Sequence, residues 1–173
     1  CSLVGSEMCI RDRYTHAVFS TALDPNVFVL RLVPGMRADI IPMLEGRYRA
    51  LVLESFGVGG LPGGDDGAMF AAVRDWCGAG HLAVFTTQVP HEGSDLAVYE
   101  VGRAAKALPG VLEAHDMTPE ATAVKLMWVL GQTTDRAEAE KLFLTQSALN
   151  QQLLKLEKDL GTPLFERRKH SMI

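Results

Sequence analysis

Short apolar runs alternate with helix-like segments through the middle of the chain. Residues 26–33 (NVFVLRLV), 50–54 (ALVLE) and 82–86 (LAVFT) are nearly continuous apolar runs, which is typical of strands buried on both faces. Between the second and third runs, residues 68–77 carry apolar side chains at helical spacing. Strands that alternate with amphipathic helices favour a parallel sheet. We therefore predict an α/β fold, a small three-layer, doubly wound and mostly parallel sheet.

Turn and cap signals add further elements. A short helix is expected around residues 40–44, although it contains a proline, and residues 57–64 (GVGGLPGG) predict a flexible loop. Thr118, followed by proline and glutamate, has the features of a helix N-terminus. Gly131 is expected to end that helix, and residues 136–143 predict another short one.

Composition narrows the class of protein. The chain has 173 residues, of which 47% are hydrophobic and 22% charged, so a packed core is expected rather than disorder. A net charge of −4 gives no reason to expect nucleic-acid binding by the chain as a whole. The three cysteines show neither metal-ligand spacing nor a disulfide framework, which favours a reducing, cytoplasmic location. No apolar run reaches transmembrane length, and we expect neither a metal site nor a membrane partner.

The two ends differ in character from the middle. Residues 1–13 (CSLVGSEMCIRDR) lack the apolar core of a signal peptide and resemble a translated sequencing adapter, so we set them aside as an artefactual or disordered segment. Residues 145–160 predict one amphipathic helix with a leucine stripe. The segment 146–173 is locally basic, while the rest of the chain is acidic.

Four segments, taken in this order and spacing, carry a family resemblance. They are residues 51–62 (LVLESFGVGGLP), 86–88 (TTQ), 92–102 (EGSDLAVYEVG), and 116–122 (DMTPEAT) with 125–128 (KLMW). Together they resemble the C-terminal domain of cytoplasmic, type I L-asparaginases over roughly residues 26–143. The resemblance implies an amidohydrolase that converts L-asparagine to L-aspartate and ammonia, and a homo-oligomer in the intact parent enzyme.

The resemblance also implies which residues contact the substrate. Glu92, Ser94 and Asp95 lie on one loop and Gly60 on another, and both loops follow strands whose carboxyl ends form the ligand edge of an α/β sheet. Some relatives carry asparagine where this chain has Gly60. The family's nucleophilic threonine lies in its N-terminal domain, so we assign no catalytic residue here, expect no cofactor, and expect this fragment to be inactive alone.

Other roles are open for the same acids. Asp95 could cap the segment that follows it or form a salt bridge with Arg103, and Glu92 could be a solvated loop acid. Thr86 and Thr87 are read as ordinary strand-end residues rather than nucleophiles, and Thr118 as a structural cap.

A second resemblance covers the C-terminal end. Residues 144–168 are similar to the recognition helix and wing entry of LysR-type transcription regulators. Residues 139–143 fit that motif's preceding helix and fit the last asparaginase helix equally well. The resemblance implies an alternative function, a DNA-binding module. Because such regulators place this motif at their N-terminus, the enzyme interpretation is preferred. The predicted domains are 1–13, 14–143 and 144–173, and the DNA contacts in the alternative would come from Gln146, Ser147, Asn150, Gln151 and Lys155.

Overall fold

A computed structural model describes residues 20–57, 59–62, 67–89, 91 and 93–144. Four parallel strands form one sheet in the order β1-β2-β3-β4. The strands are β1 (Val27–Arg31), β2 (Ala50–Ser55), β3 (Leu82–Thr87) and β4 (Val111–Glu113). The helices are α2 (Ile40–Leu44), α3 (Ala68–Gly78), α4 (Glu100–Lys106) and α5 (Pro119–Gln132), and residues 136–144 are also helical.

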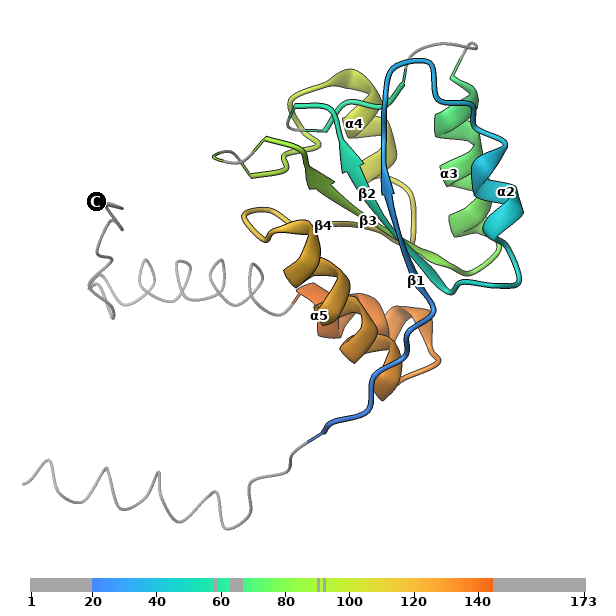
Figure 1. Cartoon of the computed structure of the whole chain (residues 1–173), viewed down its shortest axis with the longest axis vertical. Helices are drawn as coiled ribbons and strands as arrows, with labels where there is room; N and C mark the ends of the chain where they lie inside the picture. Colours follow the sequence, from blue (N-terminus) through green and yellow to red (C-terminus); the bar gives the residue numbers. More distant parts are fainter. Residues whose placement is uncertain (1–19, 58, 63–66, 90, 92, 145–173) are drawn as a thin grey trace, which may run out of the picture.

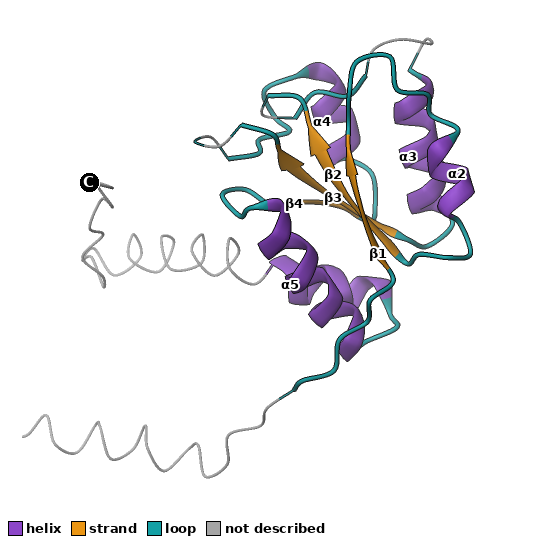
Figure 2. Ribbon diagram, viewed as in Figure 1, coloured by secondary structure: helices purple, strands orange, loops and turns teal. Residues whose placement is uncertain are grey.

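Helices cover both faces of the sheet (Figures 1 and 2). Leu51 and Leu53 of β2 face one core, which contains side chains of α2, α3 and α4. Ala50 and Val52 face the other core, which is filled by α5 and the helix at 136–144. Because successive strand residues point to opposite faces, both sets must be apolar, which explains the continuous apolar runs in the sequence. The predicted three-layer α/β class with a parallel sheet is confirmed.

The connections explain how this layering arises. The chain adds β2, β3 and β4 in one direction, and the three intervening segments carry α2, α3 and α4 over the same face. The opposite face is closed only after β4, when α5 packs against β1, β2 and β3. All described strands end at one edge of the sheet, where the loops that follow them meet (Figure 1).

Most elements lie where the sequence patterns predict them, and three details differ. The short elements α4 and β4 are not predicted by those patterns. Gly131 does not end its helix, because α5 continues to Gln132 and its cap is Thr133. Gly131 is instead a packing position, since a Cβ on it would collide with the carbonyl oxygen of Ala22. The segment 1–13 and the helix predicted at 145–160 lie outside the described residues.

Candidate functional site

The carboxyl edge of the sheet is tied together by side chains. The Ser55 hydroxyl donates to the Thr86 carbonyl at 2.8 Å, joining the ends of β2 and β3. The Gln88 amide donates to the carbonyls of Leu32 at 2.7 Å and Glu54 at 2.8 Å. Because one amide nitrogen bridges the ends of two strands, the loops that leave this edge start from fixed positions. Sequence reasoning does not predict this role of Gln88.

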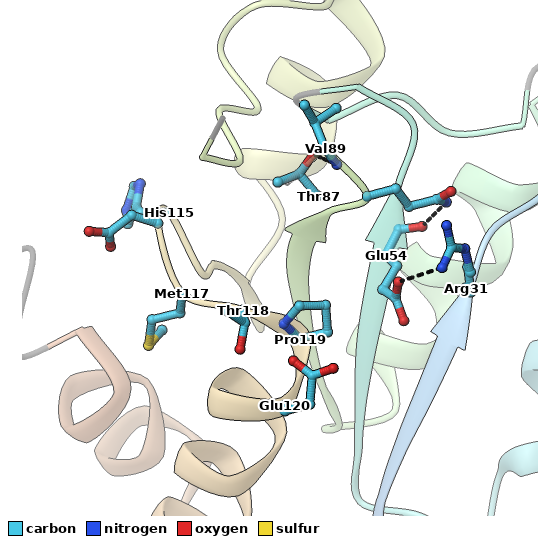
Figure 3. A pocket seen from close by; sticks show the side chains of 11 residues that line it. Arg31, Glu54, Thr87, Val89, His115, Met117, Thr118, Pro119 and Glu120 are labelled. Carbon is cyan, nitrogen blue, oxygen red and sulfur yellow. Dashed lines mark hydrogen bonds and ion pairs between the residues drawn. The ribbon is translucent and has the colours of Figure 1, made fainter. Parts of the chain in front are cut away.

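A polar cavity of about 240 Å³ opens at this edge between β1, β2 and the start of α5 (Figure 3). The guanidinium of Arg31 lies 3.9 Å from the Glu54 carboxylate, and Asp116 and Glu120 add two more carboxyl groups. The pKa of Glu120 is lowered, because its own backbone N–H and the Thr118 hydroxyl hydrogen-bond to the carboxylate. Groups of both charge signs therefore converge on this cavity. Of the residues predicted to bind substrate, the described ones, Gly60, Ser94 and Asp95, do not line it.

Ser94 is placed by the fold as an anchor of its loop. The side chain is buried, its hydroxyl donates to the Phe85 carbonyl at 3.2 Å, and its backbone N–H donates to the His115 carbonyl at 2.8 Å. His115 adopts a positive φ of 54°, a conformation that costs free energy in a non-glycine residue. The loop is thus joined to β3 and to the segment that leaves β4.

Asp95 is exposed on the same loop. Its Oδ1 accepts the backbone N–H of Ala97 at 2.9 Å, so the capping role that the sequence left open is present. Among the described residues, no ion pair joins it to Arg103. Capping uses Oδ1, and within the described ranges no hydrogen bond or ion pair involves Oδ2. Glu92, the other predicted acid, lies outside the described residues.

The fold brings the two predicted loops together. Gly60 closes a tight turn in which its N–H donates to the Phe56 carbonyl at 2.8 Å. In the same turn, a Cβ on Gly59 would lie 3.2 Å from the Asp95 carbonyl oxygen and 3.0 Å from the Leu96 side chain. The loop after β2 therefore packs directly on the loop that carries Asp95.

The Thr86 and Thr87 hydroxyls at this edge and the buried thiol of α3 are poor nucleophiles. The Thr86 hydroxyl donates to the Met117 carbonyl at 3.4 Å, and the Thr87 hydroxyl donates to the Gly57 carbonyl. Cys77 is buried in the core, and this burial raises the pKa of its thiol to about 12. A neutral thiol is a weak nucleophile at physiological pH.

Neither a metal centre nor a membrane-spanning helix is found in the described residues. Within these ranges, no three His, Cys, Asp or Glu side chains are grouped to hold a metal ion. His81, which the sequence did not assign to a site, stacks on Trp76 with ring centroids 4.3 Å apart. None of the helices in the described part of the chain is both long and apolar enough to cross a membrane.

Comparison with known families identifies the domain. A family model described as the glutaminase/asparaginase C-terminal domain matches residues 26–143, which includes all four strands, α2 to α5 and both loops described above. The chain belongs to this family. The predicted resemblance to an asparaginase C-terminal domain is confirmed at this level.

Relatives extend the comparison. The L-asparaginase of Thermococcus kodakarensis is 41% identical over 142 residues, which covers 80% of this chain and 42% of that protein. A glutamyl-tRNA(Gln) amidotransferase subunit of Metallosphaera sedula is 33% identical over 141 residues, covering 79% of this chain and 31% of that protein. This chain thus spans less than half the length of either relative.

Two solved L-asparaginase structures have the same fold over most of this chain. The thermostable L-asparaginase from Thermococcus kodakarensis superimposes with a TM-score of 0.64 at 37% identity, covering 76% of this chain and 41% of that one. L-asparaginase I from Vibrio cholerae superimposes with a TM-score of 0.62 at 28% identity, covering 72% of this chain and 37% of that one.

The resemblance of the C-terminal end to LysR-type regulators also has a matching family model. A model described as a bacterial regulatory helix-turn-helix protein of the lysR family matches residues 136–173. Of these, residues 136–144 are described, and residues 136–143 also belong to the first family match. The predicted DNA contacts Gln146, Ser147, Asn150, Gln151 and Lys155 lie outside the described residues.

Proposed function

We propose that this chain is the C-terminal domain of a cytoplasmic L-asparaginase, which hydrolyses L-asparagine to L-aspartate and ammonia. The observation that carries the proposal is the anchored loop that presents the Asp95 carboxylate at the carboxyl edge of the sheet. A carboxylate held there suits the α-ammonium group that every amino-acid substrate carries. The 41% identity to an L-asparaginase over 80% of the chain supports this choice of substrate.

The proposed role is recognition rather than bond cleavage. Hydrolysis needs a nucleophile that attacks the side-chain amide carbon, expels ammonia and leaves an acyl intermediate for water to hydrolyse. The Thr86 and Thr87 hydroxyls at this edge instead donate to backbone carbonyls, and no base is among their described partners. We assign the nucleophile to the N-terminal domain of the whole enzyme. Ser94, Asp95 and Gly60, together with Glu92, complete the site of a neighbouring subunit in a homo-oligomer.

Ammonia release tests this proposal. An enzyme in which this domain is joined to its N-terminal domain should release ammonia from L-asparagine, whereas the 173-residue chain alone should not. In that enzyme Asp95→Ala should weaken substrate binding by about 1–3 kcal/mol, because it leaves the substrate's ammonium group without its partner. Turnover by the 173-residue chain alone, at a rate comparable to the whole enzyme, would contradict the assignment of roles.

A second candidate follows from the 33% identity to an amidotransferase subunit. In that case the whole protein would act within an enzyme for glutamyl-tRNA(Gln). The two candidates differ in one measurement: ammonia release from L-asparagine that depends on added glutamyl-tRNA(Gln) favours the amidotransferase, and release without it favours the asparaginase.

A further inference from the structure

A buried carboxylate on β4 holds the loop that carries Asp95. Glu113 Oε1 accepts the backbone N–H of Leu96 at 2.6 Å, and Glu113 Oε2 lies 2.6 Å from the Lys106 ammonium group on α4. The Glu113 side chain is only 7% exposed. Because a buried carboxylate costs free energy unless its oxygens are partnered, Glu113 depends on both contacts, and the Leu96 N–H is one of them.

Glycines in α4 and in the loop after β2 allow both segments to pack closely against the loop that carries Asp95. A Cβ on Gly102 of α4 would collide with the Leu96 carbonyl oxygen, so the helix backbone touches the loop backbone. Gly59 packs on the loop from the β2 side. The Leu96 side chain is itself fully buried in the core beneath α4. The peptide that follows Asp95 therefore has a fixed position, and Glu113 supplies the charged hydrogen bond that holds it.

We propose that Glu113 is a positioning residue for substrate recognition, because it fixes the Asp95 carboxylate through the Leu96 N–H, while Lys106 balances its charge. This inference rests on the proposed function, in which Asp95 binds the substrate's ammonium group. Asp95 itself is exposed, and among the described residues its carboxylate accepts only the Ala97 N–H. Its orientation therefore depends on the backbone that Glu113 holds. A displacement of about 1 Å in such a contact costs up to about 100-fold in kcat/KM.

The test uses the enzyme in which this domain is joined to its N-terminal domain. Glu113→Ala should raise the KM for L-asparagine by about 10-fold to 100-fold with little change in kcat, because the lost contact serves substrate and transition state alike. Glu113→Gln should restore a KM close to that of the unmodified enzyme, since its amide oxygen still accepts the Leu96 N–H. In an Asp95→Ala background, Glu113→Ala should add no further rise in KM.

Asp24→Ala is the matched control. Asp24 also accepts a backbone N–H, that of Asn26 at 2.9 Å, and pairs with a cation, Arg49 at 2.7 Å. It lies before β1, at the amino edge of the sheet and therefore away from the Asp95 loop. The control should lower stability but leave the KM unchanged.

The outcomes separate the two proposals. An unmodified enzyme without asparaginase activity overturns the proposed function and this inference with it. An active enzyme in which Glu113→Ala leaves the KM unchanged, or in which the control raises it equally, overturns this inference alone. If Glu113→Ala does not fold, Glu113→Asp replaces it: its shorter side chain withdraws the acceptor, so an unchanged KM in that variant also overturns the inference.

Discussion

Gly102 and Gly131 both lie inside helices, where glycine costs up to about 1 kcal/mol relative to alanine. Each occupies a place where another segment's backbone touches the helix: Leu96 at Gly102 and Ala22 at Gly131. Helix propensity is therefore outweighed by close backbone packing at both positions. The first of these contacts also shapes the loop that carries Asp95.

Gly102→Ala is expected to lower the free energy of unfolding by about 1–3 kcal/mol, because a backbone carbonyl cannot yield as a flexible side chain can. Gly78 is the matched control, since it also lies in a helix but a Cβ there would meet nothing within 4 Å. Gly78→Ala should be neutral or stabilising. Urea denaturation of both variants measures the difference, and equal effects would contradict the packing argument.

The Asp24 carboxylate predicts a pH dependence of stability. Burial acts to raise its pKa, but hydrogen bonds from the Asn26 N–H and Arg49, with the charge of Arg49, outweigh it and lower the pKa below 3.8. A depressed folded-state pKa contributes stability above the unfolded value, and this contribution is lost as the pH falls through the folded value.

Asp24→Asn should therefore be less stable than the unmodified chain at pH 7 by about 1 kcal/mol. The gap should close as the pH falls below 3.8. Thermal unfolding across this range provides the measurement. A gap that stays constant at low pH would show that the carboxylate charge is not its source.

At the scale of elements, the stability of α5 depends on the hydrogen bonds of its first turn. The Thr118 side chain accepts the Ala121 N–H at 3.3 Å, and proline at the first helical position needs no hydrogen-bond acceptor. Thr118→Ala should cost about 0.5–2 kcal/mol of stability, because the Ala121 N–H loses its acceptor. Thr118→Ser keeps the hydroxyl and should cost less. Chemical denaturation compares the two, and an equal loss in both would exclude capping as the cause.

The helix at 136–144 is part of the α/β core. Ala139 and Phe143 are buried against the same cluster as α5, and Lys125 of α5 lies 4.7 Å from the centroid of the Phe143 ring. Burial at Phe143 is nearly complete, with 2% of the residue exposed. These contacts pack Ala139 and Phe143 onto the sheet domain, and the boundary between 143 and 144 stays a prediction.

Phe143→Ala is expected to destabilise the domain by about 3–5 kcal/mol, the cost of a large cavity in a packed core. The adjacent Leu144, which is 37% exposed, supplies the control, and Leu144→Ala should cost far less. Calorimetric unfolding of both variants checks this. A loss for Leu144→Ala as large as for Phe143→Ala would argue against the boundary.

At the scale of the whole molecule, DNA binding is the rival to the asparaginase role. In a helix-turn-helix the second helix reads DNA only when the first holds it. Ala139 and Phe143, which fit the preceding helix of that motif, are already buried against the sheet. We therefore expect only weak, salt-sensitive DNA binding. Affinities at about 50 and 200 mM salt decide the matter, because sequence-selective binding at the higher salt would support a regulator.

The sequence is most informative where a pattern is long. The strands β1, β2 and β3 follow from continuous apolar runs, and α5 follows from a hydroxyl cap before proline. The elements α4 and β4 have seven and three residues, too short for a periodic signal to stand out. The prediction for Gly131 is wrong because a glycine near a helix end is usually a stop signal, and the contact with Ala22 cannot be seen locally.

The sequence by itself determined the α/β class, the family resemblance and the loops that carry the predicted substrate contacts. Only the tertiary structure decided how those loops are held. Glu113 and Leu96 are 17 residues apart, and Gln88 reaches carbonyls 34 and 56 residues away. Such contacts depend on the parallel register that sets strand ends side by side. Periodicity reports which face a residue occupies, but not which distant backbone atom its side chain meets.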